Sequence, residues 1–186
     1  MQGPGPGKAG NHSETGKGSP ASRRLVRVHN GHTRLRLDRR ALASVIHLLD
    51  ANAPGILHPG PSPDAFHPVP PGELSLAFLT DSAMARLHAS FLGDPSPTDV
   101  ITFEGTPKLG QAGEICVSAD TALAFATGRG RDFSEELTLY VVHGWLHLAG
   151  HDDRSPADKK RMRAAEARSL ALLRTRGMIP EFVLTR

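Results

Sequence analysis

Residues 143–153 read HGWLHLAGHDD, and they combine a helical apolar pattern with five side chains that can bind a metal. His143 and His147 are four residues apart, so on a helix both rings lie on one face, one turn apart. Apolar residues flank both histidines, which predicts that the helix is buried. A buried histidine pair is costly unless something satisfies it, and zinc is the usual partner. The segment therefore predicts a metal site on a central buried helix.

The third ligand is expected in the turn that follows this helix. Gly150 marks the helix end, and His151, Asp152 and Asp153 come directly after it. A catalytic zinc takes three protein ligands and keeps one position open for water. The spacing alone leaves both His151 and Asp153 as candidates.

The residue after the first histidine argues against a metalloprotease. In the H-E-x-x-H pattern that position holds a glutamate, which acts as the general base. Here it is Gly144. A peptidase is therefore the least favoured of the functions considered.

The rest of the chain predicts an α+β fold in which a small mixed sheet of about four strands packs with helices. Asp38 and the pair Ser155-Pro156 are expected to begin helices, and residues 54–71 are expected to form a Pro- and Gly-rich surface loop. The pattern predicts strands at 25–29, 34–37, 73–79, 98–103 and 114–118, and helices at 38–49, 82–90, 119–127, 132–150 and 155–174.

Length and composition fit one domain. The chain has 186 residues, of which 39% are hydrophobic, and we expect a low-complexity disordered tail at 1–22 and a single zinc-hydrolase domain at 23–180. No apolar run approaches the roughly 20 residues of a membrane span. The tail lacks the apolar segment of a secretory signal, so we expect a cytoplasmic protein that does not bind membranes. Cys116 is the only cysteine, which excludes an intramolecular disulfide, and we expect it to be buried.

Positive charge is concentrated near the C-terminus. Residues 154–176 contain eight basic residues against two acidic ones. Such a segment beside an active site suits a polyanionic substrate. From charge alone, a solvated helix face is the better interpretation.

Three blocks of this sequence resemble the YbeY family of bacterial endoribonucleases, the rRNA maturation factors. Residues 143–153 resemble its H-G-x-L-H-L-x-G-y-D-H signature, residues 97–103 (PTDVITF) its P-T-D-V-L-S-F strand, and residues 113–118 (GEICVS) its G-D-I-x-I-S strand. The order and spacing of the blocks also fit, and the similarity covers roughly residues 70 to 175. Three blocks in order make the resemblance specific.

The resemblance implies a zinc-dependent hydrolase that cuts single-stranded RNA, with roles in 16S rRNA maturation and ribosome quality control and with the small ribosomal subunit as partner. It places one Zn²⁺ per chain on His143, His147 and Asp153. The aspartate stands where most members have a histidine, and zinc accepts carboxylate oxygen readily. His151 matches a tyrosine that is not a ligand.

The family pattern also suggests proton acceptors, namely Asp99 and Glu114, with the 2′-hydroxyl of the RNA as an alternative nucleophile. Each residue also has a purely structural interpretation, because Asp99 can cap backbone amides and Glu114 can be an ordinary acidic residue of a strand. The other histidines show no ligand spacing, and we assign them no role: His12, His29, His32, His47, His58, His67 and His88.

One departure from the family concerns RNA binding. Leu92 stands where the family carries an arginine that is thought to bind the RNA phosphate. Basic residues of the last helix are candidates to compensate: Lys159, Lys160, Arg161 and Arg163. The alternative function is a non-catalytic ribosome-associated factor in which zinc is structural.

Overall fold

The computed structural model describes residues 23–57, 67–93, 96 and 98–185. The expected tail at 1–22 and residues 58–66 of the expected 54–71 loop lie outside these residues. The strands are β1 Val26–Asn30, β2 Leu35–Arg36, β3 Glu73–Leu79, β4 Val100–Glu104, β5 Gln111–Ser118 and β6 Val183–Leu184. The helices are α1 Arg39–Ala51, α2 Ala53–Leu57, α3 Asp81–Leu92, α4 Ala119–Arg129, α5 Phe133–Leu148 and α6 Pro156–Thr175, with a 3-10 turn at Pro107–Leu109.

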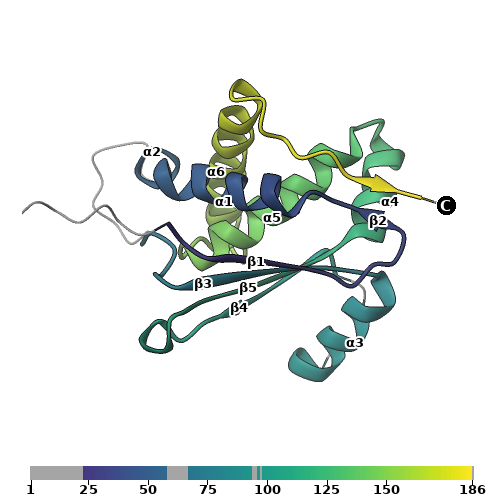
Figure 1. The fold of residues 1–186 in the computed structure, drawn as a ribbon, viewed down its shortest axis with the longest axis horizontal. Coiled ribbons are helices and arrows are strands. Elements are labelled where there is room, and N and C mark those ends of the chain that lie inside the picture. The colour runs from purple at the N-terminus through teal and green to yellow at the C-terminus, as the bar shows by residue number, and fades with distance from the viewer. Residues whose placement is uncertain (1–22, 58–66, 94–95, 97, 186) are drawn as a thin grey trace, which may run out of the picture.

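Four strands form one mixed sheet in the order β1-β3-β5-β4 (Figure 1). Strands β1, β3 and β5 run parallel, and β4 runs antiparallel to β5. Strands β2 and β6 form a separate antiparallel pair. This arrangement confirms the predicted α+β fold with a small mixed sheet.

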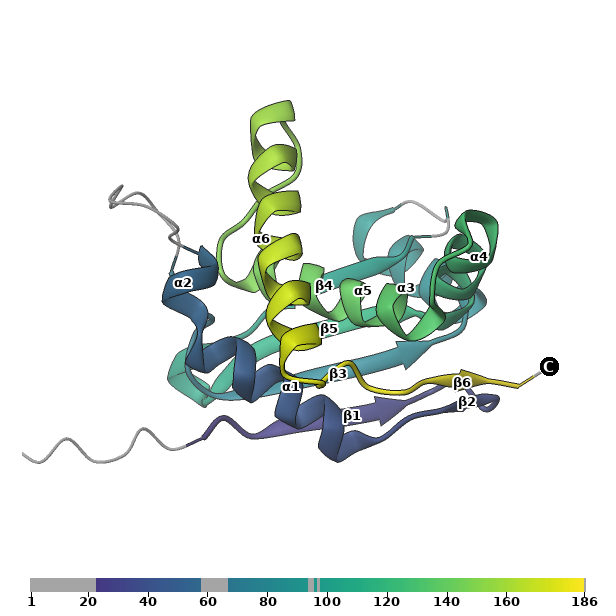
Figure 2. The same ribbon diagram turned by 90° about the horizontal axis from the view of Figure 1, so that it is seen from above.

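The helices are unequally divided between the two faces of the sheet. Helices α1, α5 and α6 lie over one face, and α3 lies on the other (Figures 1 and 2). The large core cluster fills the first layer and includes side chains as far along the chain as Phe182. A small cluster beneath α3 contains Ala77, Met84, Ile101 and Cys116. Cys116 is therefore buried, as the sequence predicted.

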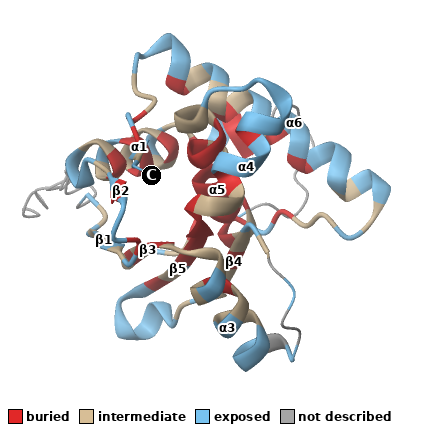
Figure 3. Cartoon of the chain, turned by 90° about the vertical axis from the view of Figure 1, so that its right-hand side faces the viewer, coloured by how far each residue is buried: buried red, intermediate tan, exposed pale blue. Residues whose placement is uncertain are grey.

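Helix α5 runs through the centre of the molecule and is largely buried (Figure 3). It begins at Asp132, whose side chain accepts a hydrogen bond from the backbone N–H of Glu135 at 2.9 Å. It stops before Gly150, which has a φ of 83°. The His151 N–H then donates to the Leu146 carbonyl at 3.0 Å, as in a Schellman-type helix end. Both predicted ends of this helix are confirmed.

Gly144 lets α5 lie close against β5. A Cβ built at this position would lie 2.3 Å from Cγ2 of Ile115, a separation that real Cβ atoms do not show. No side chain fits there unless Ile115 moves. The packing of helix on sheet thus explains the glycine and disfavours the glutamate of a metalloprotease at this position.

Local departures from the prediction have simple physical causes. Residues 53–57 form α2 where a loop was expected, because Pro54 is tolerated in the first turn of a helix and Ile56 and Leu57 are buried. Helix α4 continues past Gly128 and ends at Gly130, which adopts the left-handed conformation. Strand β2 pairs with β6, which the sequence analysis did not predict.

Within the described residues, no helix is both long and apolar enough to cross a membrane.

Candidate metal centre

His143 and His147 lie on one face of α5, as predicted. Their Nε2 atoms are 2.9 Å apart, and the two rings are nearly perpendicular, at 89°. The Nδ1 of His143 contacts Oε1 of Glu166 at 2.7 Å, and the Nδ1 of His147 contacts the carbonyl oxygen of His151 at 2.9 Å. Carboxylate and carbonyl oxygens only accept, so both Nδ1 atoms carry a proton and donate it.

This arrangement requires positive charge between the rings. With a proton on each Nδ1, two neutral imidazoles would point two lone pairs at each other. A shared proton or a metal cation removes that repulsion. Hydrogen bonds that fix the tautomer in this way are typical of histidines that bind metals.

Asp153 completes the cluster from the turn after α5. One donor atom from each of His143, His147 and Asp153 lies within 4.8 Å of the others. His151 does not belong to this group, and it is buried with 4% of its surface exposed. Of the two third ligands that the spacing left open, the structure brings Asp153 to the histidine pair.

The pKa values of the two histidines move in opposite directions. Burial lowers the pKa of His143, but the hydrogen bond and charge of Glu166, aided by Asp99 and Asp153, outweigh it and raise that pKa. Burial and the facing charge of His143 lower the pKa of His147.

The cluster opens onto a pocket of about 540 Å³ beside β4. Strand β4 is an outer strand of the sheet, so its outer edge borders this pocket. The lining residues come from α3, from β4 and its approach, and from the end of α5: His88, Thr98, Val100, Ile101, Thr102, Glu104, His147, Gly150, His151, Asp152, Asp153 and Arg154. A ligand in this pocket meets the cluster at one side.

Asp99, the first predicted proton acceptor, lies next to this centre. Its Oδ1 accepts a hydrogen bond from the N–H of Val100 at 2.9 Å, which is the backbone-capping role considered for it. The side chain is nevertheless exposed, and its charge helps to raise the pKa of His143. The two roles are compatible.

Glu114, the second predicted proton acceptor, lies on the other face of the sheet. Its neighbour Ile115 packs against Gly144 of α5, and successive strand residues point to opposite faces. Glu114 accordingly lines a separate hollow with Glu73 and Ser75. The structure does not bring Glu114 to the histidine pair.

Glu166 of α6 is a site residue that the sequence analysis missed. It is half-buried, and it holds His143 through the 2.7 Å contact described above. A signal was present, because Glu166 is four residues after the buried Met162 and so belongs to the buried face of α6. Its place in a predominantly basic segment concealed it.

The basic residues of α6 have different surroundings. Arg168 donates two hydrogen bonds to the Ile56 carbonyl, Arg174 pairs with Glu135, and Arg161 pairs with Asp158. Lys159, Lys160 and Arg163 are exposed. They belong to the N-terminal half of α6, which projects from the body of the molecule (Figure 2). The Leu92 side chain lies outside the described part of the structure.

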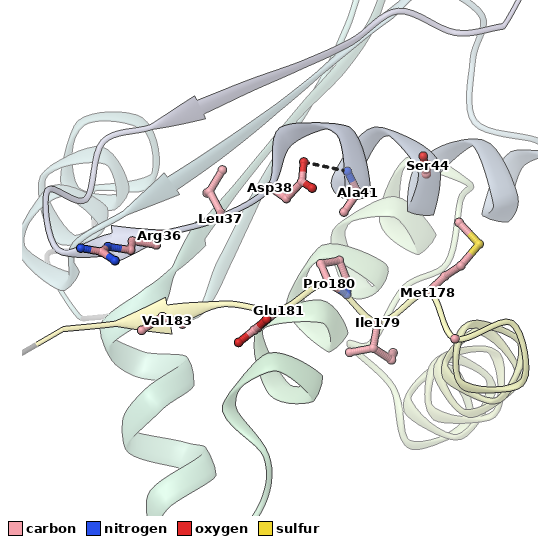
Figure 4. Close-up of a pocket in the computed structure, with 11 residues that line it drawn as sticks. Arg36, Leu37, Asp38, Ala41, Ser44, Met178, Ile179, Pro180, Glu181 and Val183 are labelled. Carbon is pink, nitrogen blue, oxygen red and sulfur yellow. Dashed lines mark hydrogen bonds between the residues drawn. The ribbon is translucent and has the colours of Figure 1, made fainter.

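A second cavity, of about 600 Å³, lies between α1 and residues 177–183 (Figure 4). Leu37, Met178, Ile179 and Val183 make its wall largely apolar. Asp38 is occupied in capping α1, where it accepts from the N–H of Ala41 at 3.2 Å. No histidine or cysteine is among the residues that line this cavity, and it offers no comparable metal chemistry.

The fold and the site together define a class: an α+β protein with a candidate mononuclear metal centre of two imidazoles and one carboxylate. The family model described as "Endoribonuclease YbeY" matches residues 62–174. The chain therefore belongs to the YbeY family.

Two relatives support this assignment, and one solved structure shows a similar fold. An Endoribonuclease YbeY from Myxococcus xanthus is 39% identical over 115 residues, which cover 59% of this chain and 38% of that protein. One from Chlamydia abortus is 40% identical over 105 residues, covering 52% of this chain and 66% of that protein. The solution structure of TM1509 from Thermotoga maritima shares the fold, with a TM-score of 0.51, 20% identity, and coverage of 83% of this chain and 95% of that one.

Proposed function

We propose that this chain is a zinc-dependent, single-strand-specific endoribonuclease that matures the 3′ end of 16S rRNA and contributes to ribosome quality control. Its partners in this proposal are single-stranded RNA and the small ribosomal subunit, and its location is the cytoplasm. Membership of the YbeY family supports the ribonuclease activity.

The observation that carries the proposal is the 2.9 Å approach of the two Nε2 atoms beside Asp153. Two nitrogens bound to one tetrahedral zinc are about 3.3 Å apart, as bond lengths of about 2.05 Å require. A small increase in the distance between the two Nε2 atoms would therefore accommodate the ion. In the proposal His143, His147 and Asp153 hold one zinc, and the pocket beside β4 receives the RNA.

A bound zinc supplies a Lewis acid and lowers the pKa of a water molecule to roughly 7. The protein residues have separate tasks. Glu166 orients His143, and the His151 carbonyl orients His147. We retain Asp99 as the candidate proton acceptor, because its exposed carboxylate influences His143. Glu114 is not retained, since it lies on the opposite face of the sheet.

The projecting half of α6 is the proposed docking surface for the RNA backbone. We expect a triple Ala variant of Lys159, Lys160 and Arg163 to bind single-stranded RNA more weakly and with a shallower salt dependence. Each lost phosphate contact should reduce the slope of log K against log [salt] by about 0.7. An unchanged slope would remove α6 from the interface.

Cleavage of a defined single-stranded RNA tests the function, with His147→Ala as the test variant and His47→Ala as the control. His47 lies on α1 and contacts the Arg24 carbonyl, away from the cluster. The proposal predicts cleavage by the wild type and the control, and its loss in His147→Ala while circular dichroism stays native. A wild type that binds zinc but leaves the RNA intact, with His147→Ala unfolded, would instead indicate a structural zinc in a binding factor.

A further inference from the structure

His88 of α3 reaches the same pocket as the candidate metal centre. It lines the cavity of about 540 Å³ together with His147 and Asp153. The pocket thus has a histidine from α3 in addition to the cluster on and after α5. The spacing of His88 in the sequence gave no sign of this placement, because the two histidine-bearing helices are far apart along the chain.

The orientation of the His88 ring is fixed by a hydrogen bond. Its Nδ1 lies 2.9 Å from the carbonyl oxygen of Ser96. A carbonyl oxygen only accepts, so Nδ1 is the donor. Nε2, on the other side of the ring, is the nitrogen left for a ligand. Histidines that are oriented through one nitrogen and act through the other are common at catalytic sites.

A phosphate that enters this pocket needs a positively charged group beside it. Glu104, Asp152 and Asp153 make the lining acidic, and an RNA phosphate needs positive groups to offset them. Arg154 also lines the pocket, but its guanidinium lies 3.6 Å from Asp152.

We infer that His88 is a substrate-contacting residue whose Nε2 binds the phosphodiester held at the metal centre. The inference rests on the proposed function and adds a specific phosphate contact to it. Because Nδ1 donates to Ser96, the contact requires a second proton on Nε2, so that His88 binds the phosphate as an imidazolium. An imidazolium donates a charge-assisted hydrogen bond to a phosphate oxygen, which is among the stronger hydrogen bonds in proteins.

A double-mutant cycle between His88 and the phosphate tests the contact. A short single-stranded RNA that the zinc-loaded wild type cleaves at one mapped bond is made in two forms. One keeps the phosphodiester at that bond, and the other carries an uncharged methylphosphonate. Dissociation constants for the wild type and for His88→Ala are measured before appreciable cleavage. We expect His88→Ala to weaken binding of the natural RNA by about 10- to 100-fold and to change binding of the methylphosphonate RNA far less.

His29→Ala is the matched control. His29 is an exposed histidine on β1, at the opposite edge of the sheet from β4. This variant should bind both RNAs as the wild type does. Zinc content, measured for every variant, should be equal.

Two results would overturn the inference and leave the proposed function standing. In the first, His88→Ala binds the natural RNA as tightly as the wild type does. In the second, His88→Ala weakens the binding of both RNAs equally, which would show that His88 acts only through its contact with Ser96. A wild-type chain that neither binds nor cleaves RNA would overturn the proposed function and the inference with it.

Discussion

At the scale of the residue, Glu166 positions one histidine of the candidate metal site. Its contact with Nδ1 directs the Nε2 lone pair of His143 toward His147. Removing a group that orients a metal ligand typically weakens metal binding by 10- to 100-fold. We therefore expect Glu166→Ala to lower zinc affinity by about that factor with little change in fold. Competition with a chromophoric chelator measures the affinity.

Glu135→Ala is the matched control for this variant, because Glu135 pairs with Arg174 on an exposed surface. It should bind zinc like the wild type. Equal zinc affinity in both variants would show that Glu166 does not position His143.

Gly144 provides a second prediction at this scale. The added methyl group in Gly144→Ala meets Ile115, and such overpacking costs about 1–3 kcal/mol. The free energy of unfolding is measured by urea denaturation. Gly128→Ala is the control, because nothing lies within 4 Å of a Cβ at that helical position. A Gly144→Ala variant as stable as the wild type would refute the close packing of α5 on β5.

Residue patterns explain which parts of the site were predictable. The spacing of His143 and His147 is local, and helical geometry alone places both rings on one face. The sheet face on which Glu114 lies could also have been predicted. Its neighbour Ile115 is apolar and faces the core, and successive strand residues point to opposite faces. Contacts between distant elements, such as Glu166 with His143 or His88 with the pocket, depend on how α6 and α3 pack. No short sequence window contains that information.

At the scale of the element, Asp50 joins α1 to α5 and to the first described residues. It accepts a hydrogen bond from the indole N–H of Trp145 at 3.0 Å and from Nε of Arg24 at 2.7 Å. Trp145 is fully buried, so its N–H would lose its partner in Asp50→Ala. We expect that variant to lose about 2–4 kcal/mol of stability in urea denaturation.

Asp50→Asn retains an acceptor for the indole N–H and should lose less stability than Asp50→Ala. Equal losses of unfolding free energy in Asp50→Ala and Asp50→Asn would show that the hydrogen bond to Trp145 does not contribute to stability.

The N-termini of α3 and α4 are linked through Asp120, which makes their packing sensitive to acid. Burial raises the pKa of Asp120, but the backbone N–H of Asp81, together with His32 and Arg34, lowers it below the ordinary 3.8. Because the folded-state pKa is depressed, this stabilisation is fully present above pH 3.8 and is lost as pH falls through the folded-state value.

We expect the stability gap between the wild type and Asp120→Asn to be larger at pH 7 than below pH 3. Urea midpoints at both values measure it. A gap independent of pH would contradict the depressed pKa of Asp120.

Strand β5 gives a simple chemical test of the core. Burial raises the pKa of the Cys116 thiol to about 12, with a smaller contribution from Glu114. The thiolate is the reactive form, so the native protein should react very slowly with a disulfide reagent at pH 8 and fully after unfolding. Rapid reaction of the native protein would mean that the layer beneath α3 opens readily.

At the scale of the whole molecule, the candidate metal ligands lie on the central helix and directly after it, so a bound metal should stabilise the fold. A metal that binds only the folded chain stabilises it by about 2.7 kcal/mol at a concentration 100 times its dissociation constant. For a chain of this length, that corresponds to roughly 5–10 °C in Tm. We expect a chelator to lower the Tm of the wild type by this amount and to leave the Tm of His147→Ala unchanged. A wild-type Tm that a chelator does not move would argue against a bound metal.

The sequence predicted the types and order of the long elements better than it predicted element boundaries and the pairing of the short strands. Long periodic elements such as α5 and α6 were predictable because each has a strong cap and a buried face. The pairing of β2 with β6 was not, since two-residue strands carry almost no pattern and lie far apart in the chain. The position of Asp153 depended on the turn that Gly150 allows, which explains why spacing alone could not separate it from His151.

Metal content of the untagged protein tests the central claim most directly. Elemental analysis of the wild type should give about one zinc per chain, and His143→Ala and Asp153→Ala should lose it or bind it far more weakly. Folded protein without metal in any form, or zinc retained in both variants, would contradict the assignment of His143, His147 and Asp153 as the metal centre.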